Sequence, residues 1–287
     1  TQQETLFPYT TLFRSEIAEL KELRALDISG TQVANLVPLN SLRGLKRLRC
    51  NRAPVVDLAP LSGLQLLQHL ACGGTLVTDL SPLAKLHELQ VLLCWNTAVA
   101  DLSLLAGLRG LKTLFCSGTQ VADLGPLADL KGLQSFRCGR TPVTDLSALA
   151  SLPSLEELYF DWCKIDVHYC EIWEKPSLKR VGCYRARLRD VPVEVLSQTL
   201  VENALPKLRA HFRDLGPAPE RMRDAKLMVL GNGRVGKTQL CRRLFGEPFE
   251  EGADSTHGIV VHPLAFDAAP ATLHVWDFGG QDIYHGT

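Results

Sequence analysis

At 287 residues the chain is long enough for two domains, and its 46% hydrophobic content is ordinary for a globular protein. Its 31 lysines and arginines balance 31 aspartates and glutamates, so the formal net charge is zero. A surface that binds nucleic acid or an anionic membrane needs a basic excess, so we expect neither. No stretch approaches the roughly 18 apolar residues of a membrane span, so none is expected.

The N-terminal stretch 1–15 differs from everything that follows it. It shows no repeat pattern, and it lacks the charged-then-apolar layout of a secretory signal. Residues 5–15 resemble translated sequencing-adaptor sequence. We therefore expect 1–15 to be a non-native stretch that takes no part in the fold.

A 22-residue phrase then repeats along the chain. One copy, which begins at Leu111 and ends at Leu127, fits the leucine-rich-repeat template L-x-x-L-x-L-x-x-N-x-L, with cysteine in the third leucine position and threonine in the asparagine position. The register holds for about seven repeats from Leu23 to Ile165, and a weaker closing unit covers 178–196. The predicted fold class is therefore α/β, with a leucine-rich-repeat solenoid over 16–197. Each repeat supplies one short strand to a parallel sheet on the concave face.

The predicted convex side of each repeat is a short helix or 3-10 turn. In the repeat that contains residues 79–83, Ser81 is the expected N-cap and Pro82 the first helical residue. A preceding polar position recurs through the repeats, and we expect each of its side chains to accept backbone N–H bonds within its turn. A Ca²⁺ ladder is the alternative. The column contains Asn35, Asp57, Asp79, Asp101, Asp123 and Asp145.

Cysteine recurs every 22 residues in a position that is otherwise leucine or isoleucine. A single-file column does not offer the tetrahedral geometry of a metal site, so we interpret the thiols as small apolar core groups rather than a metal or redox ladder. Buried reduced thiols fit a reducing compartment, and we expect a cytoplasmic protein. The column contains Cys50, Cys72, Cys94, Cys116 and Cys138.

The outward positions of the strands are not dictated by the repeat, so they are candidates for recognition. In the predicted grid an apolar patch lies mid-solenoid, with arginine at its edge. An exposed aromatic surface rimmed by arginine is typical of a protein-binding hot spot. Scattered surface hydrophobic residues, or a contact with another part of the same protein, are the alternatives. The candidate partner-binding residues are Val91, Leu93, Trp95, Phe115, Arg137 and Tyr159.

Residues 198–224 are predicted to form a helical linker. Apolar residues at helical spacing cover 201–215, although Pro206 weakens this prediction, and the Gly-Pro-Ala-Pro run at 216–219 ends it.

A phosphate-binding loop follows a buried-strand run at 226–230. Residues 231–238 match G-x-x-x-x-G-K-[ST], in the order strand, glycine loop and helix that this motif requires. In such a loop Lys237 reaches the β- and γ-phosphates, and the hydroxyl of Thr238 ligates Mg²⁺. The predicted nucleotide-binding residues are Gly231, Asn232, Gly233, Arg234, Val235, Gly236, Lys237, Thr238, Gln239 and Gly280.

A second motif, D-x-G-G-Q, follows a strand that ends at Asp277. The Asp277 carboxylate suits a Mg²⁺ contact, Gly280 can donate its N–H to the γ-phosphate, and Gln281 can orient the attacking water as the catalytic residue. Thr256 lies in a polar segment where a switch threonine would close on Mg²⁺. Strands at 259–266 and 272–276 are predicted to form the edge hairpin of a Ras-like sheet.

Together these motifs resemble the Roc domain of Roco proteins, particularly bacterial ones. The resemblance rests on 225–238, 255–259 and 276–281, and on the repeats directly before them. It implies that 225–287 is the N-terminal part of a Roc GTPase domain that binds GTP or GDP with Mg²⁺. In that family a COR domain follows Roc and dimerises, so a homodimer through a downstream COR domain is implied for the longer protein. No base-reading N/T-K-x-D motif occurs within this sequence, so guanine specificity rests on the resemblance and on D-x-G-G-Q.

The leading hypothesis is a slowly hydrolysing GTP switch coupled to a leucine-rich-repeat scaffold that binds a protein. One alternative is an interaction solenoid with a non-hydrolysing nucleotide domain. The other is an ATP-using signalling NTPase, but that class carries a pair of acidic residues at the strand end, and Phe278 follows Asp277. We expect this fragment alone to be inactive.

Overall fold

The computed structural model describes residues 17–167, 170–215, 224–229, 237–249, 259–266 and 269–278. The chain divides into two compact units between Asp214 and Leu215. Each unit is described by itself below. The predicted stretch 1–15 lies outside the described residues.

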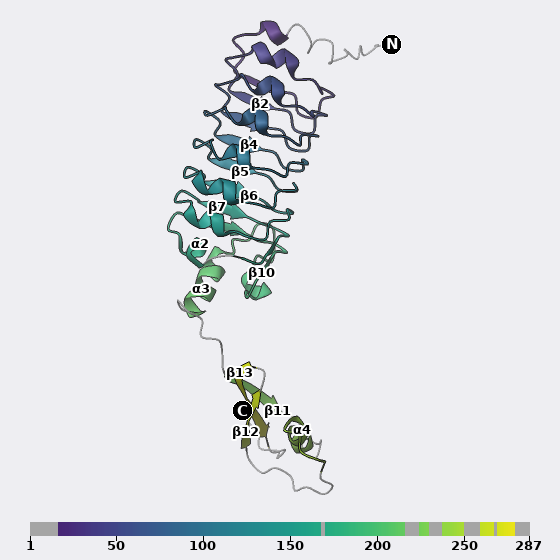
Figure 1. Cartoon of the computed structure of the whole chain (residues 1–287), viewed down its shortest axis with the longest axis vertical. Coiled ribbons are helices and arrows are strands. Elements are labelled where there is room, and N and C mark those ends of the chain that lie inside the picture. The colour runs from purple at the N-terminus through teal and green to yellow at the C-terminus, as the bar shows by residue number, and fades with distance from the viewer. Residues whose placement is uncertain are drawn as a thin grey trace. The chain divides into compact units, whose positions relative to one another are not determined.

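The first unit is built on an eight-stranded parallel sheet whose strands follow chain order. Each strand pairs with the next in a register of one repeat, as where Leu92 lies opposite Leu114. Figure 1 shows the short strands stacked along this unit, with short helices beside them. This confirms the predicted leucine-rich-repeat fold. The strands are β1 (Ala25–Asp27), β2 (Arg47–Arg49), β3 (His69–Ala71), β4 (Val91–Leu93), β5 (Thr113–Phe115), β6 (Ser135–Arg137), β7 (Glu157–Tyr159) and β9 (Arg180–Gly182).

The core of this unit is one continuous column of leucines and cysteines. In β5 the side chains of Leu114 and Cys116 are fully buried, whereas Thr113 and Phe115 on the other face are only partly buried. Burial raises the pKa of the Cys116 thiol to about 12. All five cysteines of the predicted column are buried and free of disulfides, which confirms their role as core groups.

The threonine in the asparagine position has a defined structural role. The buried Thr119 hydroxyl donates to the carbonyl oxygen of Cys116 at 2.6 Å, and the same bond recurs from Thr75, Thr97 and Thr141 to the cysteine three residues earlier. A buried carbonyl left without a partner costs about 1–3 kcal/mol. Threonine therefore closes the turn after β3, β4, β5 and β6 by satisfying a buried carbonyl there.

The other side of each repeat carries a short 3-10 helix. The predicted polar column accepts the backbone N–H two residues on, as where Asp79 Oδ1 accepts from Ser81 N at 2.7 Å, and the same bond is present at all six positions. The capping role expected of Ser81 is therefore filled by Asp79, and Ser81 is the first residue of its helix. The helices are η1 (Ile17–Glu19), η2 (Val37–Ser41), η3 (Ala59–Leu61), η4 (Ser81–Leu83), η5 (Ser103–Leu105), η6 (Gly125–Asp129), η7 (Ser147–Ser151) and η8 (Val193–Val195).

The C-terminal end of the sheet departs from the repeat. Helix α2 (Cys170–Glu174) precedes β9, and a separate two-stranded sheet pairs β8 (Lys164–Ile165) with β10 (Arg187–Leu188). The buried Trp173 ring packs on Phe160, at 6.2 Å between ring centroids. The weak closing repeat predicted over 178–196 is thus present as the last strand and its surroundings.

Helix α3 (Leu205–Leu215) covers this end of the repeats. Leu205 and Leu208 are buried in the same hydrophobic cluster as the repeats. Arg209 donates from Nε to the Trp173 carbonyl at 2.8 Å and from Nη2 to two further carbonyls. Pro206 is the second residue of the helix, where its missing N–H costs nothing. The helix expected within a 198–224 linker therefore packs as an end cap of the first unit.

The second unit contains a three-stranded sheet and one described helix. Strand β13 (Ala269–Phe278) lies between β11 (Asp224–Val229), its parallel neighbour, and β12 (Ile259–Phe266), its antiparallel neighbour. Helix α4 (Lys237–Leu244) contributes Cys241 to a small core with Val229 and Val275. The predicted hairpin is confirmed, with β12 as its edge strand.

Candidate functional site

The start of α4 is the described part of the predicted phosphate site. Lys237 is the first residue of the helix and only 9% exposed, and Thr238 follows it, half-buried. The free N–H groups of a helix N-terminus and the helix dipole favour an anion there. A lysine and a hydroxyl at this point are the donor set that a nucleotide phosphate and its Mg²⁺ require.

The sheet places Asp277, the first residue of the second motif, beside the end of β11. Strands β11 and β13 are parallel, with Val229 opposite Asp277. Val229 is the last residue of β11, the strand that precedes the loop motif in the sequence. Carboxyl ends of parallel strands are where α/β proteins bind ligands.

Several predicted residues of this site lie outside the described part of the chain. These are the loop residues Gly231, Asn232, Gly233, Arg234, Val235 and Gly236, the switch residue Thr256, and Gly280 and Gln281 of the second motif. Of the predicted set, the structure thus describes Lys237, Thr238 and Gln239 in α4, and the backbone of Asp277 in β13.

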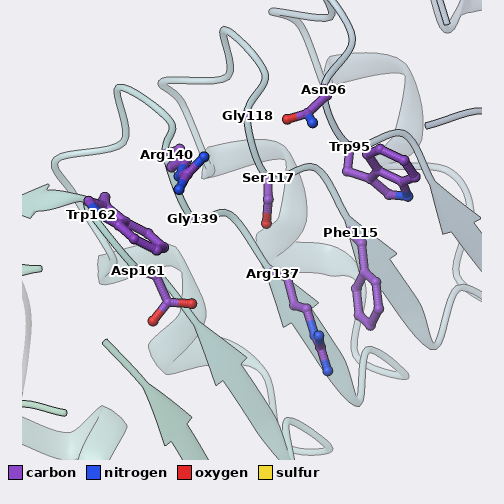
Figure 2. A pocket seen from close by; sticks show the side chains of 10 residues that line it. All are labelled: Trp95, Asn96, Phe115, Ser117, Gly118, Arg137, Gly139, Arg140, Asp161 and Trp162. Atoms are coloured by element: carbon purple, nitrogen blue, oxygen red, sulfur yellow. The ribbon is translucent and has the colours of Figure 1, made fainter. Parts of the chain in front are cut away.

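The first unit carries a pocket of about 410 Å³ on the solvent face of its sheet, the predicted concave face. Figure 2 shows Trp95 and Phe115 on one side of it and Trp162 and Asp161 on the other, with Ser117 between them. This volume lies within the range of ligand pockets, about 300–1,000 Å³. The lining residues are Trp95, Asn96, Phe115, Ser117, Gly118, Arg137, Gly139, Arg140, Asp161 and Trp162.

Arg137 connects the predicted patch to this pocket. Its guanidinium carbon lies 4.3 Å from the centroid of the Phe115 ring and 4.2 Å from that of Tyr159. Trp95, Phe115 and Arg137, three of the candidate partner-binding residues, line the pocket. Val91 and Leu93, half-buried on β4, and Tyr159, on β7, lie on the same face but do not line it.

Glycines give the aromatic rings their positions. A β-carbon on Gly73 would overlap the Trp95 ring, and one on Gly182 would overlap the Tyr159 ring. A β-carbon on Gly139 would press on the Asp161 backbone at 3.1 Å, in the middle of the pocket. Of these glycines only Gly139 lines the pocket, and the neighbouring repeats carry Ser117 and Asp161 at its position.

Asp161 supplies the one carboxylate of the pocket lining. Burial raises its pKa, although the Tyr184 N–H, which donates at 2.7 Å, and the charges of Arg137 and Arg140 favour the ionised form. The pocket thus combines two cations, one half-buried carboxylate and three aromatic rings.

Comparison with known proteins agrees with both units. The family described as "Ras of Complex, Roc, domain of DAPkinase" matches residues 226–287. Internalin C2 from Listeria monocytogenes is 30% identical with a TM-score of 0.54, over 58% of this chain and 74% of the internalin. The chain belongs to the leucine-rich-repeat proteins and carries a Roc domain.

Two longer repeat proteins show the same fold. An internalin F from Listeria monocytogenes is 27% identical with a TM-score of 0.57, over 61% of this chain and 52% of that one. A leucine-rich-repeat protein from Leptospira interrogans is 22% identical with a TM-score of 0.57, over 61% and 46% of the two chains. This chain therefore spans about half the length of each. Repeats followed by Roc is the domain order of the Roco proteins that the sequence resembles.

Seven residues that line the pocket were not among the predicted partner-binding residues, namely Asn96, Ser117, Gly118, Gly139, Arg140, Asp161 and Trp162. Arg140 and Trp162 occupy a position, just after each strand, where the backbone is left-handed, with φ of 57° and 59°. Gly30, Gly74 and Gly118, in the same column, share this conformation. Their 22-residue spacing was the signal that could have marked the column as a ridge beside the concave face. Asn96 belongs to that ridge, and Asp161 to the last outward strand column.

Within the described ranges, no group of three or more His, Cys, Asp or Glu side chains is placed to hold a metal ion. None of the described helices is long and apolar enough to cross a bilayer.

Proposed function

We propose that this chain is part of a GTP-binding switch whose leucine-rich repeats bind a protein partner. The observation that carries the nucleotide part is the position of Lys237. This lysine of the G-x-x-x-x-G-K-T motif is buried and is the first residue of α4. The parallel pairing of β11 with β13 supports it, because Asp277 then lies opposite Val229 at the end of β11.

The proposed roles of the residues follow from Ras-like phosphoryl transfer. Lys237, with backbone N–H groups of 231–236 and of Gln239, binds the phosphates, and Gly280 donates to the γ-phosphate. Thr238, Thr256 and Asp277 are the proposed ligands of Mg²⁺, which neutralises phosphate charge when bound. Gln281 orients the attacking water. The intrinsic rate would be slow, because an arginine supplied in trans contributes about 10³–10⁵ to Ras-like hydrolysis.

The proposed partner of the repeats is a protein that binds the concave face. Aromatic rings and arginines in a defined pocket are the residue types that dominate protein interfaces. A homodimer through a COR domain, which the resemblance to Roco proteins implies, belongs to the proposal for the longer protein. With balanced charge we propose no nucleic-acid partner, and we propose a cytoplasmic location from the reduced cysteines.

The experiment that tests the nucleotide part compares fluorescent GTP and ATP on the protein with its complete Roc domain. We expect Mg²⁺-dependent binding of GTP at least about tenfold tighter than ATP, with slow release of phosphate from GTP. Equal or tighter binding of ATP would overturn the GTPase in favour of an ATP-using NTPase. Tight GTP binding without phosphate release would favour a non-hydrolysing nucleotide domain.

A further inference from the structure

The pocket on the predicted concave face is lined by Arg137, whose positive charge forms no ion pair with another described residue. Arg137 is half-buried, and its Nε is buried without a hydrogen-bond partner. None of the ion pairs among the described residues involves Arg137 or Arg140. A buried guanidinium N–H without an acceptor is unfavourable. Because Arg137 also lines the pocket, an acidic ligand there would meet a guanidinium whose charge no described ion pair neutralises.

The two faces of the Arg137 guanidinium are already occupied. Phe115 and Tyr159 lie over them at 4.3 and 4.2 Å, which holds the side chain in one orientation. Stacking leaves the planar edge of the group, with its N–H donors, for hydrogen bonds. Such a fork matches the two oxygens of a carboxylate.

A second arginine is fixed on the opposite side of the pocket. Arg140 stacks on Trp162 at 4.2 Å, and both residues have the left-handed backbone that glycine adopts at the equivalent position of other repeats. Figure 2 shows Arg140 beside Trp162, across Ser117 from Trp95. Arg52 and Asn96 adopt the same conformation, so it is a feature of the repeat that also sets the positions of Arg140 and Trp162.

The charge of the pocket selects among anions. Arg137 and Arg140 give two positive charges and Asp161 one negative, so the ionised lining carries a net charge of +1. A side-chain carboxylate has one negative charge and neutralises the lining, whereas a phosphoryl group carries about −1.5 to −2 and would leave the occupied pocket with a net negative charge. The aromatic rings of Trp95, Phe115 and Trp162 suit an apolar side chain next to that carboxylate.

We propose that this pocket binds an internal acidic segment of a protein, with a glutamate or aspartate carboxylate on Arg137 and a neighbouring aromatic or aliphatic side chain between the rings, while the positive charge of Arg140 adds to the attraction for the acidic segment. This inference rests on the proposal that the concave face binds a protein, and it specifies the chemistry of that partner. It does not depend on nucleotide binding by the Roc domain.

The test uses the full chain and a matched set of labelled peptides, followed by fluorescence anisotropy at low salt. The probe is acetyl-Gly-Gly-Phe-Glu-Glu-Phe-Gly-Gly-amide, and the controls carry two glutamines, or two phosphoserines, in place of the glutamates. A free-acid form of the glutamine peptide reports on a terminal carboxylate. We expect the glutamate peptide to bind at least about tenfold tighter than every control.

Variants then assign the binding to the pocket. Arg137→Gln should weaken the glutamate peptide by at least about tenfold and remove its advantage over the glutamine peptide. Arg137→Lys, which keeps the charge but not the planar fork, should be intermediate. Arg47→Gln is the matched control, because Arg47 is an exposed arginine on the same face but outside the pocket lining. If Arg137→Gln does not fold, Arg140→Gln removes the second positive charge of the pocket lining at an exposed position and should also weaken the glutamate peptide.

Four results would overturn the inference. The first is equal binding of the glutamate and glutamine peptides, with both affinities lost in Trp95→Ala. That result would show a peptide site on this face that does not recognise a carboxylate. The second and third are tighter binding of the phosphoserine or the free-acid peptide. The fourth is no binding by any peptide. Nucleotide titration of the same preparation shows separately whether the Roc proposal stands.

Discussion

The repeat unit and the Roc unit differ in how their candidate functional residues relate to the sequence pattern. In the repeats, periodic positions such as Leu114 and Cys116 form the core, and the pocket is built from positions that break the period, such as Trp95 and Arg137. In the Roc unit the fixed pattern is itself the proposed site, because Lys237 and Thr238 belong to a motif whose spacing suits a phosphate. A regular pattern therefore indicates stability in one unit and chemistry in the other.

The largest effect is expected when a periodic core side chain is removed. Leu114→Ala should lower the free energy of unfolding of the repeat unit by about 2–5 kcal/mol, because it leaves a cavity in a fully buried column. Leu104→Ala is the control. Its side chain is 43% exposed, so the change should stay within about 0.5 kcal/mol. Urea unfolding followed by circular dichroism measures both, and equal effects would contradict the assigned core.

A second change tests where the repeat unit ends. Arg209→Ala removes the charged hydrogen bonds from α3 to three carbonyls and should cost about 1–3 kcal/mol of repeat-unit stability. Arg213→Ala, an exposed arginine on the same helix, should cost much less. If both variants unfold at the wild-type urea midpoint, α3 is a linker and not an end cap.

The smallest expected effect concerns pH. Hydrogen bonds from the Ser81 hydroxyl and N–H hold the pKa of Asp79 below its usual value, and those from Ser103 do so for Asp101. A lowered folded-state pKa contributes stability above the unfolded pKa of about 3.9, and this is lost as the pH falls through the folded value. Unfolding midpoints should therefore decline below about pH 4.

Asp79→Asn should flatten that acid decline while keeping the bond to the Ser81 N–H, as Asn35 does for Val37 in the first turn. Asp129→Asn, at an exposed position of η6, is the control and should leave the decline unchanged. An identical acid profile in wild type and Asp79→Asn would show that these turns do not couple to pH.

The sequence predicted most of the fold because repetition makes its signals redundant. The strand register, the cysteine core and the aspartate turns each recur several times, so one irregular copy such as 170–183 does not hide the pattern. The end cap α3 was assigned to a linker because its partners, Trp173 and the carbonyl of Lys175, lie more than thirty residues away in sequence. Only tertiary contacts distinguish a cap from a linker.

Only part of the pocket was predicted, because some of its residues are brought together by the folded backbone and not by a pattern in the sequence. Trp95, Phe115 and Arg137 stand out as large outward residues on neighbouring strands, so the grid of strand positions reveals them. Arg140 and Trp162 lie one residue beyond that grid, where only the backbone conformation of the turn shows that they face the same space. The Roc site was predicted from its motif, and the paired strands add that Asp277 lies opposite Val229 at the end of β11.

The central claim is tested most directly by GTP binding to the protein with its complete Roc domain, in Mg²⁺, with wild type and Lys237→Ala compared. We expect at least about a hundredfold loss of affinity in the variant, since the proposed role of the buried Lys237 is to bind the phosphates. Arg243→Ala, at an exposed position of the same helix, should bind GTP as wild type does. Unchanged GTP affinity in Lys237→Ala would contradict the account.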